Sequence, residues 1–239
     1  MMRSITLGDI CSFQKGASIP RDNTGILLDI PYLHYGDIYK KYSVSVDIDD
    51  VFDSIIKISS DEKTKPEQQL NNQDIVYNLT SETIDDLGKS VIIRNKTNKP
   101  FVAGMETTVM RVERRDLVYP PYLNYVLQTK GFYSLLQQYV TGMKVFRVHP
   151  RDISRISLDF PPLEEQKWIS KLGDNLTDRI DANKAVNHRL ATRSATDNSP
   201  DIKRGKRMLR KSARCALSCS SNSCCSNIGA QASLKRASA

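Results

Sequence analysis

Two predicted elements meet in the segment Phe160-Pro161-Pro162-Leu163-Glu164-Glu165-Gln166-Lys167-Trp168-Ile169. Residues 155–160, which lead into it, are typical of a short strand. Proline is tolerated in the first turn of a helix, and Glu164 and Glu165 favour the positive end of the helix dipole. The stretch therefore predicts a strand that ends near residue 160 and a helix that begins directly after it.

Downstream of this start, apolar residues recur every three or four positions on an otherwise polar segment. The stripe consists of Ile169, Leu172, Leu176 and Ile180 and continues through Asn183, Asn187 and Leu190. A long helix with one narrow stripe usually packs against another helix, as in a coiled coil. We expect one such helix over residues 161–190. The alternative is a terminal helix that folds back on its own domain through the stripe.

Beyond the helix, the composition changes. Residues 189–239 hold 11 Lys or Arg and 2 Asp or Glu, which leaves 24 basic and 25 acidic residues in 1–188. The pI of about 9.2 thus belongs to the tail, and DNA or RNA binding by the rest needs a local patch. Rich in Ser and Arg and without aromatics, residues 191–239 are expected to be disordered.

The tail also holds four cysteines, namely Cys215, Cys219, Cys224 and Cys225. Such spacing is compatible with zinc or with disulfides, but no histidine lies nearby and no strand or turn pattern surrounds them. We predict no metal site.

Upstream of the helix, residues 1–160 are expected to form one domain of the α+β class. Short β-branched runs predict strands at residues 73–77, 89–94, 107–112, 145–148 and 155–160. Helical spacing predicts helices at residues 120–128 and 132–139. No apolar run approaches the ~20 residues that cross a bilayer, and no signal peptide opens the chain, so we expect a cytoplasmic protein without a membrane partner.

Three fragments resemble catalytic motifs and fail in detail. Residues 87–90 end like a phosphate-binding loop, but a strand-like run follows where a helix is needed. Residues 119–122, Tyr-Pro-Pro-Tyr, lack the Asn or Asp that an amino-methyltransferase site requires. Residues 165–167, Glu-Gln-Lys, match part of a nuclease motif but lie at a helix start. The three histidines, His34, His149 and His188, have neither metal-site spacing nor a nucleophile beside them. We predict no catalytic residue.

Five stretches, in order along the chain, resemble the specificity subunit of type I restriction-modification systems. They are residues 7–10 with Lys15 and Gly16, residues 31–38, residues 72–76 with 86–90, residues 122–128 with 142–147, and, most specifically, Pro161-Pro-Leu-Glu-Glu-Gln166 with its long helix. The resemblance covers about three-quarters of the chain.

This resemblance implies a DNA target-recognition domain over residues 1–160, which reads one half of a bipartite double-stranded DNA site, and a spacer helix over 161–190. In the family, two such domains and helices share one chain and dock a modification (methyltransferase) subunit and a restriction (nuclease and translocase) subunit. Those partners use S-adenosylmethionine, ATP and magnesium, and no cofactor is expected for this chain.

The sequence holds one recognition domain and one helix, so two copies pairing their helices would read a palindromic bipartite site. The change of composition at Arg189 favours an out-of-frame or truncated end, and a basic tail that holds DNA phosphates is another interpretation. Two further alternatives are a small restriction endonuclease or methyltransferase fragment and a nonfunctional truncated remnant.

Candidate DNA contacts are cations and aromatic residues in or beside predicted loops. They are Lys144 and Arg147 beside Gly142, then Lys15, Arg21, Lys40, Lys41 and Lys89, with Tyr35 and Tyr39 as stacking candidates. Arginine and lysine bind guanine edges or phosphates, and the sequence does not distinguish the two.

Overall fold

The computed structural model describes residues 3–84 and 87–197. The chain forms two units, Met1–Thr177 and Asp178–Ala239, and their border lies inside the long helix α7 (Leu163–Asp197). The first unit is an α+β domain, as predicted. In the described part of the chain, no helix is long and apolar enough to span a membrane.

A five-stranded sheet forms the centre of the first unit, in the order β2-β11-β7-β9-β5. Its strands are β2 (Cys11–Lys15), β5 (Ser45–Asp47), β7 (Ile75–Asn78), β9 (Ser90–Arg94) and β11 (Thr107–Val112). All neighbours are antiparallel except β5 and β9. In β7, all four residues are buried, because the sheet is covered on both faces.

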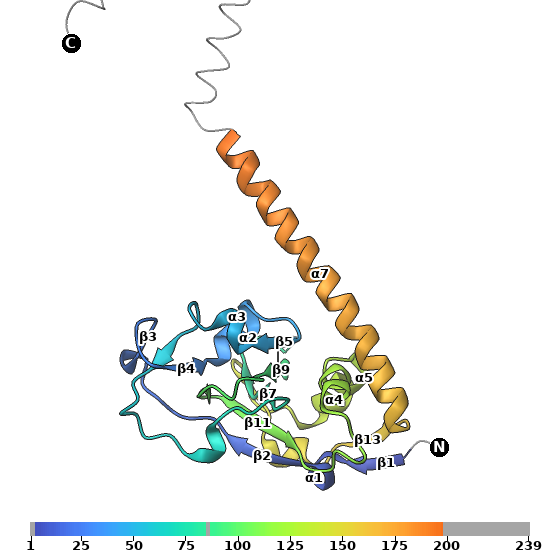
Figure 1. The fold of residues 1–239 in the computed structure, drawn as a ribbon. Coiled ribbons are helices and arrows are strands. Elements are labelled where there is room, and N and C mark those ends of the chain that lie inside the picture. The colour runs from blue at the N-terminus through green and yellow to red at the C-terminus, as the bar shows by residue number, and fades with distance from the viewer. Residues whose placement is uncertain (1–2, 85–86, 198–239) are drawn as a thin grey trace, which may run out of the picture. The chain divides into compact units, whose positions relative to one another are not determined.

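Alternate residues of the central strands contribute to two different cores, as the period of two in a strand requires. Ile75, Tyr77 and Ile92 belong to one core, whereas Val76 and Val91 belong to the other. The first core includes residues of α1 (Leu7–Ile10), α4 (Pro120–Leu127), α5 (Lys130–Leu136) and α6 (Pro150–Ile153), and the second includes residues of α2 (Tyr35–Lys40) and α3 (Ile48–Val51) (Figure 1).

Smaller elements complete the domain. A four-stranded sheet has the order β10-β4-β6-β3, with β3 (Thr24–Gly25), β4 (Ile30–Leu33), β6 (Lys57–Ile58) and β10 (Val102–Ala103). Two further pairs are β1 (Arg3–Thr6) with β13 (Ser157–Phe160), and β8 (Thr80–Ser81) with β12 (Phe146–Arg147). The 3₁₀ turns are η1 (Arg21–Asn23), η2 (Pro66–Gln68) and η3 (Gln137–Tyr139).

All five predicted strands are present, as β7, β9, β11, β12 and β13, although β12 has only two residues. The two predicted helices are α4 and α5 with η3. The long helix begins at Leu163, after the two prolines, and continues past residue 190 to Asp197. The helix thus extends seven residues past the predicted boundary at residue 190, and residues 191–197 contain no proline or glycine. The rest of the predicted tail lies outside the described residues.

The face by which α7 packs on its own domain is polar rather than apolar. Gln166 and Ser170 are 0% and 1% exposed. A side chain at Gly173 would come within 2.7 Å of the Tyr125 ring, so glycine allows the close contact. Leu172 and Leu176, in contrast, are 48% and 53% exposed. The stripe therefore does not fold back on the first unit at these two positions.

Candidate nucleic-acid interface

Several of the predicted contact residues lie at one end of the central sheet. There β2 ends at Lys15, which pairs with Thr108, and β9 begins one residue after Lys89. Gly16 follows Lys15 and packs directly on Gly104, since a Cβ at Gly16 would lie 1.9 Å from the Gly104 carbonyl oxygen. Gly104 thus lies next to the end of β2, two residues before Glu106 in the sequence.

The pair β8–β12 extends the same end of the sheet. Its register joins Phe146 to Ser81 and Arg147 to Thr80. The Leu79 N–H donates to the Glu106 carbonyl oxygen at 3.0 Å, and the Val148 N–H donates to the Leu79 carbonyl oxygen at 3.0 Å. The strand that carries Arg147 is therefore fixed to the central sheet.

Side chains tie α2 to this pair. The Tyr39 hydroxyl donates to the Thr80 carbonyl oxygen, and the Thr80 hydroxyl donates to the Glu106 carboxylate. Lys89 Nζ donates to the Tyr39 carbonyl oxygen at 3.0 Å. Glu106 has a φ of 58°, in the left-handed region that non-glycine residues rarely adopt. These bonds bring the predicted residues Tyr39, Lys89 and Arg147 together around Thr80.

The loop between η3 and β12 is a tight hairpin. The Thr141 N–H donates to the Arg147 carbonyl oxygen at 2.9 Å, and the Arg147 N–H donates to the Thr141 carbonyl oxygen at 2.8 Å. Gly142 has a φ of 103°, and a Cβ there would lie 2.0 Å from the Val145 carbonyl oxygen. Only glycine fits that position, so Lys144 is presented at the exposed tip of a defined turn.

The other predicted residues are less closely connected. Tyr35 stacks at a tilt on His34, with ring centroids 4.4 Å apart. Burial lowers the pKa of His34, and the positive charge of nearby Arg21 lowers it further, against the opposite effect of Asp37. Arg21 thus lies within electrostatic range of the start of α2. Lys40 is exposed in the last turn of that helix.

Lys41 differs from these cations, because it forms an ion pair with Asp37 at 3.0 Å. Its charge is partly neutralised by that carboxylate, and the structure does not bring it into the group around Thr80.

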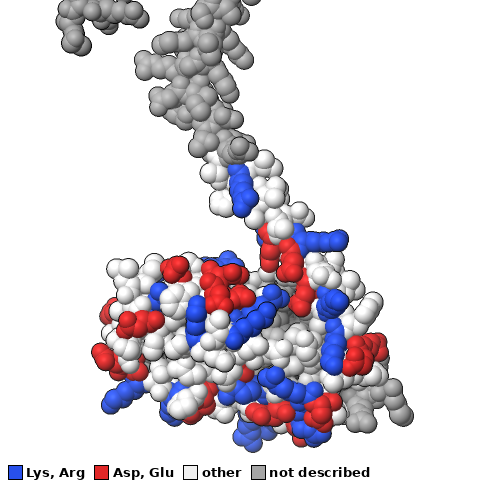
Figure 2. Space-filling model, viewed as in Figure 1, with Lys and Arg blue, Asp and Glu red and all other residues white. Residues whose placement is uncertain are grey.

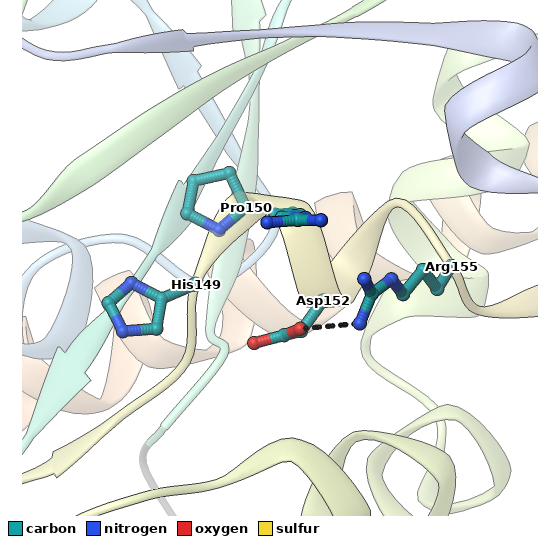
Figure 3. Close-up of a pocket in the computed structure, with 5 residues that line it drawn as sticks. His149, Pro150, Asp152 and Arg155 are labelled. Atoms are coloured by element: carbon teal, nitrogen blue, oxygen red, sulfur yellow. Dashed lines mark hydrogen bonds and ion pairs between the residues drawn. The ribbon is translucent and has the colours of Figure 1, made fainter.

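A basic hollow that the sequence analysis did not identify follows the hairpin. His149, Pro150, Arg151, Asp152 and Arg155 line an open depression of about 530 Å³ on α6. Figure 3 shows His149 and Arg155 on opposite sides of Asp152, which pairs with Arg155 at 3.4 Å. Residues 144–155 contain four Lys or Arg and one Asp, and a local charge count would have identified this segment as basic, although not the hollow itself.

On one face of the molecule the charges are mixed (Figure 2). Figure 2 shows basic and acidic side chains intermingled over the face in view, as the balanced count for residues 1–188 predicts. Local patches such as that of residues 144–155 are therefore where a polyanion would bind.

Two of the fragments that resemble catalytic motifs form a turn before a strand and the start of a helix. Lys89 and Ser90 lead into β9, and Gly88, with a φ of 78°, forms the turn before it. Residues 119–122 start α4, with Tyr119 as its N-cap. In the described part of the chain, no group of three His, Cys, Asp or Glu residues could hold a metal ion.

Comparison with solved structures gives the fold. The chain is similar to the type I restriction-modification S subunit from M. genitalium, at 11% identity and a TM-score of 0.56, over 82% of this chain and 45% of that one. It is also similar to a chain in a structure of type I R-M complex assembly and conformational transition, at 17% identity, TM-score 0.52, and coverage of 85% and 43%. The HsdS subunit from Thermoanaerobacter tengcongensis matches at 17% identity, TM-score 0.50, and coverage of 77% and 39%.

The chain thus spans less than half the length of each of these solved subunits. No curated protein sequence matches it significantly. The model of the type I restriction modification DNA specificity domain matches residues 2–192 of the 239, including the prolines, Gln166 and most of the long helix. This chain therefore belongs to the family of type I restriction modification DNA specificity domains.

Proposed function

We propose that this chain reads one half of a bipartite double-stranded DNA site and directs the modification and restriction subunits to it. The observation that carries the proposal is the family match over residues 2–192. In this role the chain performs no chemistry itself and needs no cofactor, since its partner subunits use S-adenosylmethionine, ATP and magnesium. Such a subunit works in the cytoplasm, where the DNA is.

The end of the sheet around Thr80 supports a role in DNA contact. Lys15, Lys89 and Arg147 belong to three different strands or strand ends there, and the exposed cations of residues 144–155 continue along the chain into α6. Phosphate contacts by such cations position a protein on DNA, while contacts to base edges give sequence preference. We infer that both kinds of contact come from this end of the sheet.

We further propose that the stripe on α7 pairs with an equivalent helix. In the first unit Leu172 and Leu176 are exposed, and in the second Ile180 and Leu190 are 53% and 54% exposed. Regularly spaced leucines in water are costly, and a second helix would cover them. With two copies, the paired helices would hold two equal recognition domains on a symmetric site.

The test is selection of bound sequences from random duplex DNA by the full chain, alone and together with a type I modification subunit. Enrichment of a bipartite motif supports the proposal, and equal halves support pairing of two copies. Salt-sensitive binding without enrichment would reject sequence reading. In parallel, the chain alone with DNA, magnesium and S-adenosylmethionine should neither cut nor methylate; either activity would identify an enzyme instead.

A further inference from the structure

Met143 is exposed to an unusual degree for a large apolar side chain. It is 94% exposed, and Leu27, at 98%, is the one large apolar residue of the described part of the chain that is more exposed. Single exposed apolar residues are common on protein surfaces, so exposure alone assigns no role. The surroundings of Met143 distinguish it.

Met143 lies at the tip of a braced hairpin rather than on a loose loop. Two backbone bonds between Thr141 and Arg147, at 2.8 and 2.9 Å, close the turn. The strand at its base pairs with β8, which Tyr39 and Glu106 hold through Thr80. The tip is therefore pre-organised, so that little conformational entropy is lost when it contacts a partner.

The charge around the hairpin suits a polyanion. Residues 141–149 contain Lys144 and Arg147 and no Asp or Glu. Leu27, although equally exposed, lies between Asp22 and Asp29 in the sequence, and these carboxylates would face DNA phosphates unfavourably. The hairpin of Met143 is thus the better candidate for close approach to DNA, and the loop of Leu27 is a matched control.

We propose that this hairpin enters the major groove and that Met143 contacts the C5-methyl group of a thymine. The major groove admits a two-stranded ribbon, and the thymine methyl is the apolar group that bases display there. A methionine side chain is flexible and polarisable and adapts to such a surface. Lys144 and Arg147 belong to the same hairpin and would bind phosphates or guanine edges beside the contact. The inference rests on the proposed function, which it makes specific to one side chain and one base.

The experiment uses the full chain and its selected site, in which each thymine is replaced in turn by deoxyuridine, which lacks only the methyl group. Burial of one methyl group corresponds to about a four-fold change in Kd, so one replacement should weaken wild-type binding by about that factor. In Met143→Ala the same replacement should change Kd by less than about 1.5-fold, whereas Leu27→Ala should keep the wild-type response. Salt dependence should be equal in all three proteins, because no charge changes.

The outcomes separate this inference from the proposed function. Suppose that the wild-type chain prefers a sequence and that Met143→Ala keeps the full response to deoxyuridine at every thymine. This result would overturn the inference and leave the proposed function intact. The inference is equally overturned if no thymine in the selected site responds in the wild type. A wild-type chain with no sequence preference would refute the proposed function and this inference with it. Both substitutions are at exposed positions, and unchanged thermal unfolding would verify the fold.

Discussion

Gln166 joins the long helix to its domain through one fully satisfied amide. Its Nε2 donates to the carbonyl oxygens of Leu117 and Pro161, both at 2.8 Å, and its Oε1 accepts from the Tyr119 N–H at 2.9 Å. The side chain is 0% exposed, so these bonds are not exchanged with water. These three bonds require a donor and an acceptor on one planar group. The glutamine side chain has such an amide and is long enough to reach all three partners.

Replacing Gln166 by leucine should lower the free energy of unfolding by about 3 kcal/mol, because a buried N–H and two carbonyl oxygens lose their partner. Gln166→Glu should also destabilise, since a carboxylate would face the two carbonyl oxygens. Urea unfolding at about pH 7.5 measures both. Glu165→Gln, an exposed change in the same turn, is the control and should stay within about 0.5 kcal/mol of wild type. A Gln166→Leu protein as stable as this control would contradict the role.

His34 should make stability depend on mildly acidic pH. Its Nδ1 accepts the Gly36 N–H at 3.1 Å as the N-cap of α2, and burial lowers its pKa below the ordinary value of 6.5. The unfolded chain therefore binds the proton at higher pH than the folded chain does. This contribution to stability is intact above about pH 6.5 and is lost progressively as the pH falls below it.

The measurement is the unfolding free energy between about pH 5 and 7.5 for the wild type and His34→Asn. Asparagine caps helices well and does not titrate, so the variant should lose less stability on acidification than the wild type. Parallel pH curves for the two proteins would exclude His34 as the titrating group.

Single residues differed in how well they could be predicted. Gln166 stands in the short motif that carried the family resemblance, and Lys144 and Arg147 are candidates because they follow Gly142 in a predicted turn. The network of Tyr39, Thr80 and Glu106 could not be found, since its members are 26 and 41 positions apart and meet only through strand register. The DNA contacts themselves stay a prediction.

Among the elements, α7 has two faces with different chemistry. The face toward the first unit carries Gln166, Ser170 and Gly173, and the neighbouring face carries Leu172 and Leu176. An apolar face left exposed while a polar face is buried is the reverse of an ordinary terminal helix. Ile169, predicted to belong to the stripe, is partly buried.

Pairing of α7 predicts that the wild-type chain sediments as a dimer at micromolar concentration. The double variant Leu172→Gln and Leu176→Gln should raise the dimer Kd at least about 100-fold, because a symmetric pair loses four buried leucines. Lys167→Gln with Lys171→Gln is the matched control and should leave the dimer intact. Analytical ultracentrifugation measures both, and equal Kd values for the two double variants would count against pairing through the stripe.

Elements with strong periodicity were predictable, and elements made by long-range pairing were not. The strand β11 was predicted with its observed bounds, as a β-branched run between turn residues. The strands β3, β6 and β10 have two residues each, so no periodicity can develop within them. The short helices α1, α2 and α3 begin at the side-chain caps Thr6, His34 and Asp47, which are weak signals in a sequence without a following apolar stripe.

Charge is distributed unevenly along the chain. Residues 198–239, outside the described part, contain nine Lys or Arg and one Asp, whereas residues 1–188 are nearly balanced. Residues 198–239 are therefore expected to add non-specific affinity for DNA to the contacts of the sheet end, without adding sequence preference.

Replacing the nine cations of residues 198–239 by glutamine should weaken non-specific DNA binding and reduce its salt dependence, because fewer counterions are released. The selected motif should stay the same. Binding isotherms between 50 and 200 mM salt, roughly the range over which such contacts weaken most, give the slope. A changed motif would assign sequence reading to the tail.

The bonds of Gln166 tolerate substitution of the residues that it contacts. All three of its partners are main-chain atoms, which every residue possesses. Substitution at residues 117 and 161 leaves these acceptors in place, and only proline at residue 119 would remove the donor. Mutation can therefore alter the side chains of the domain, and under the proposed function the DNA sequence that they would read, while the helix keeps its attachment. Under the proposed function, a new DNA target would thus require no compensating change in the bonds that hold the helix.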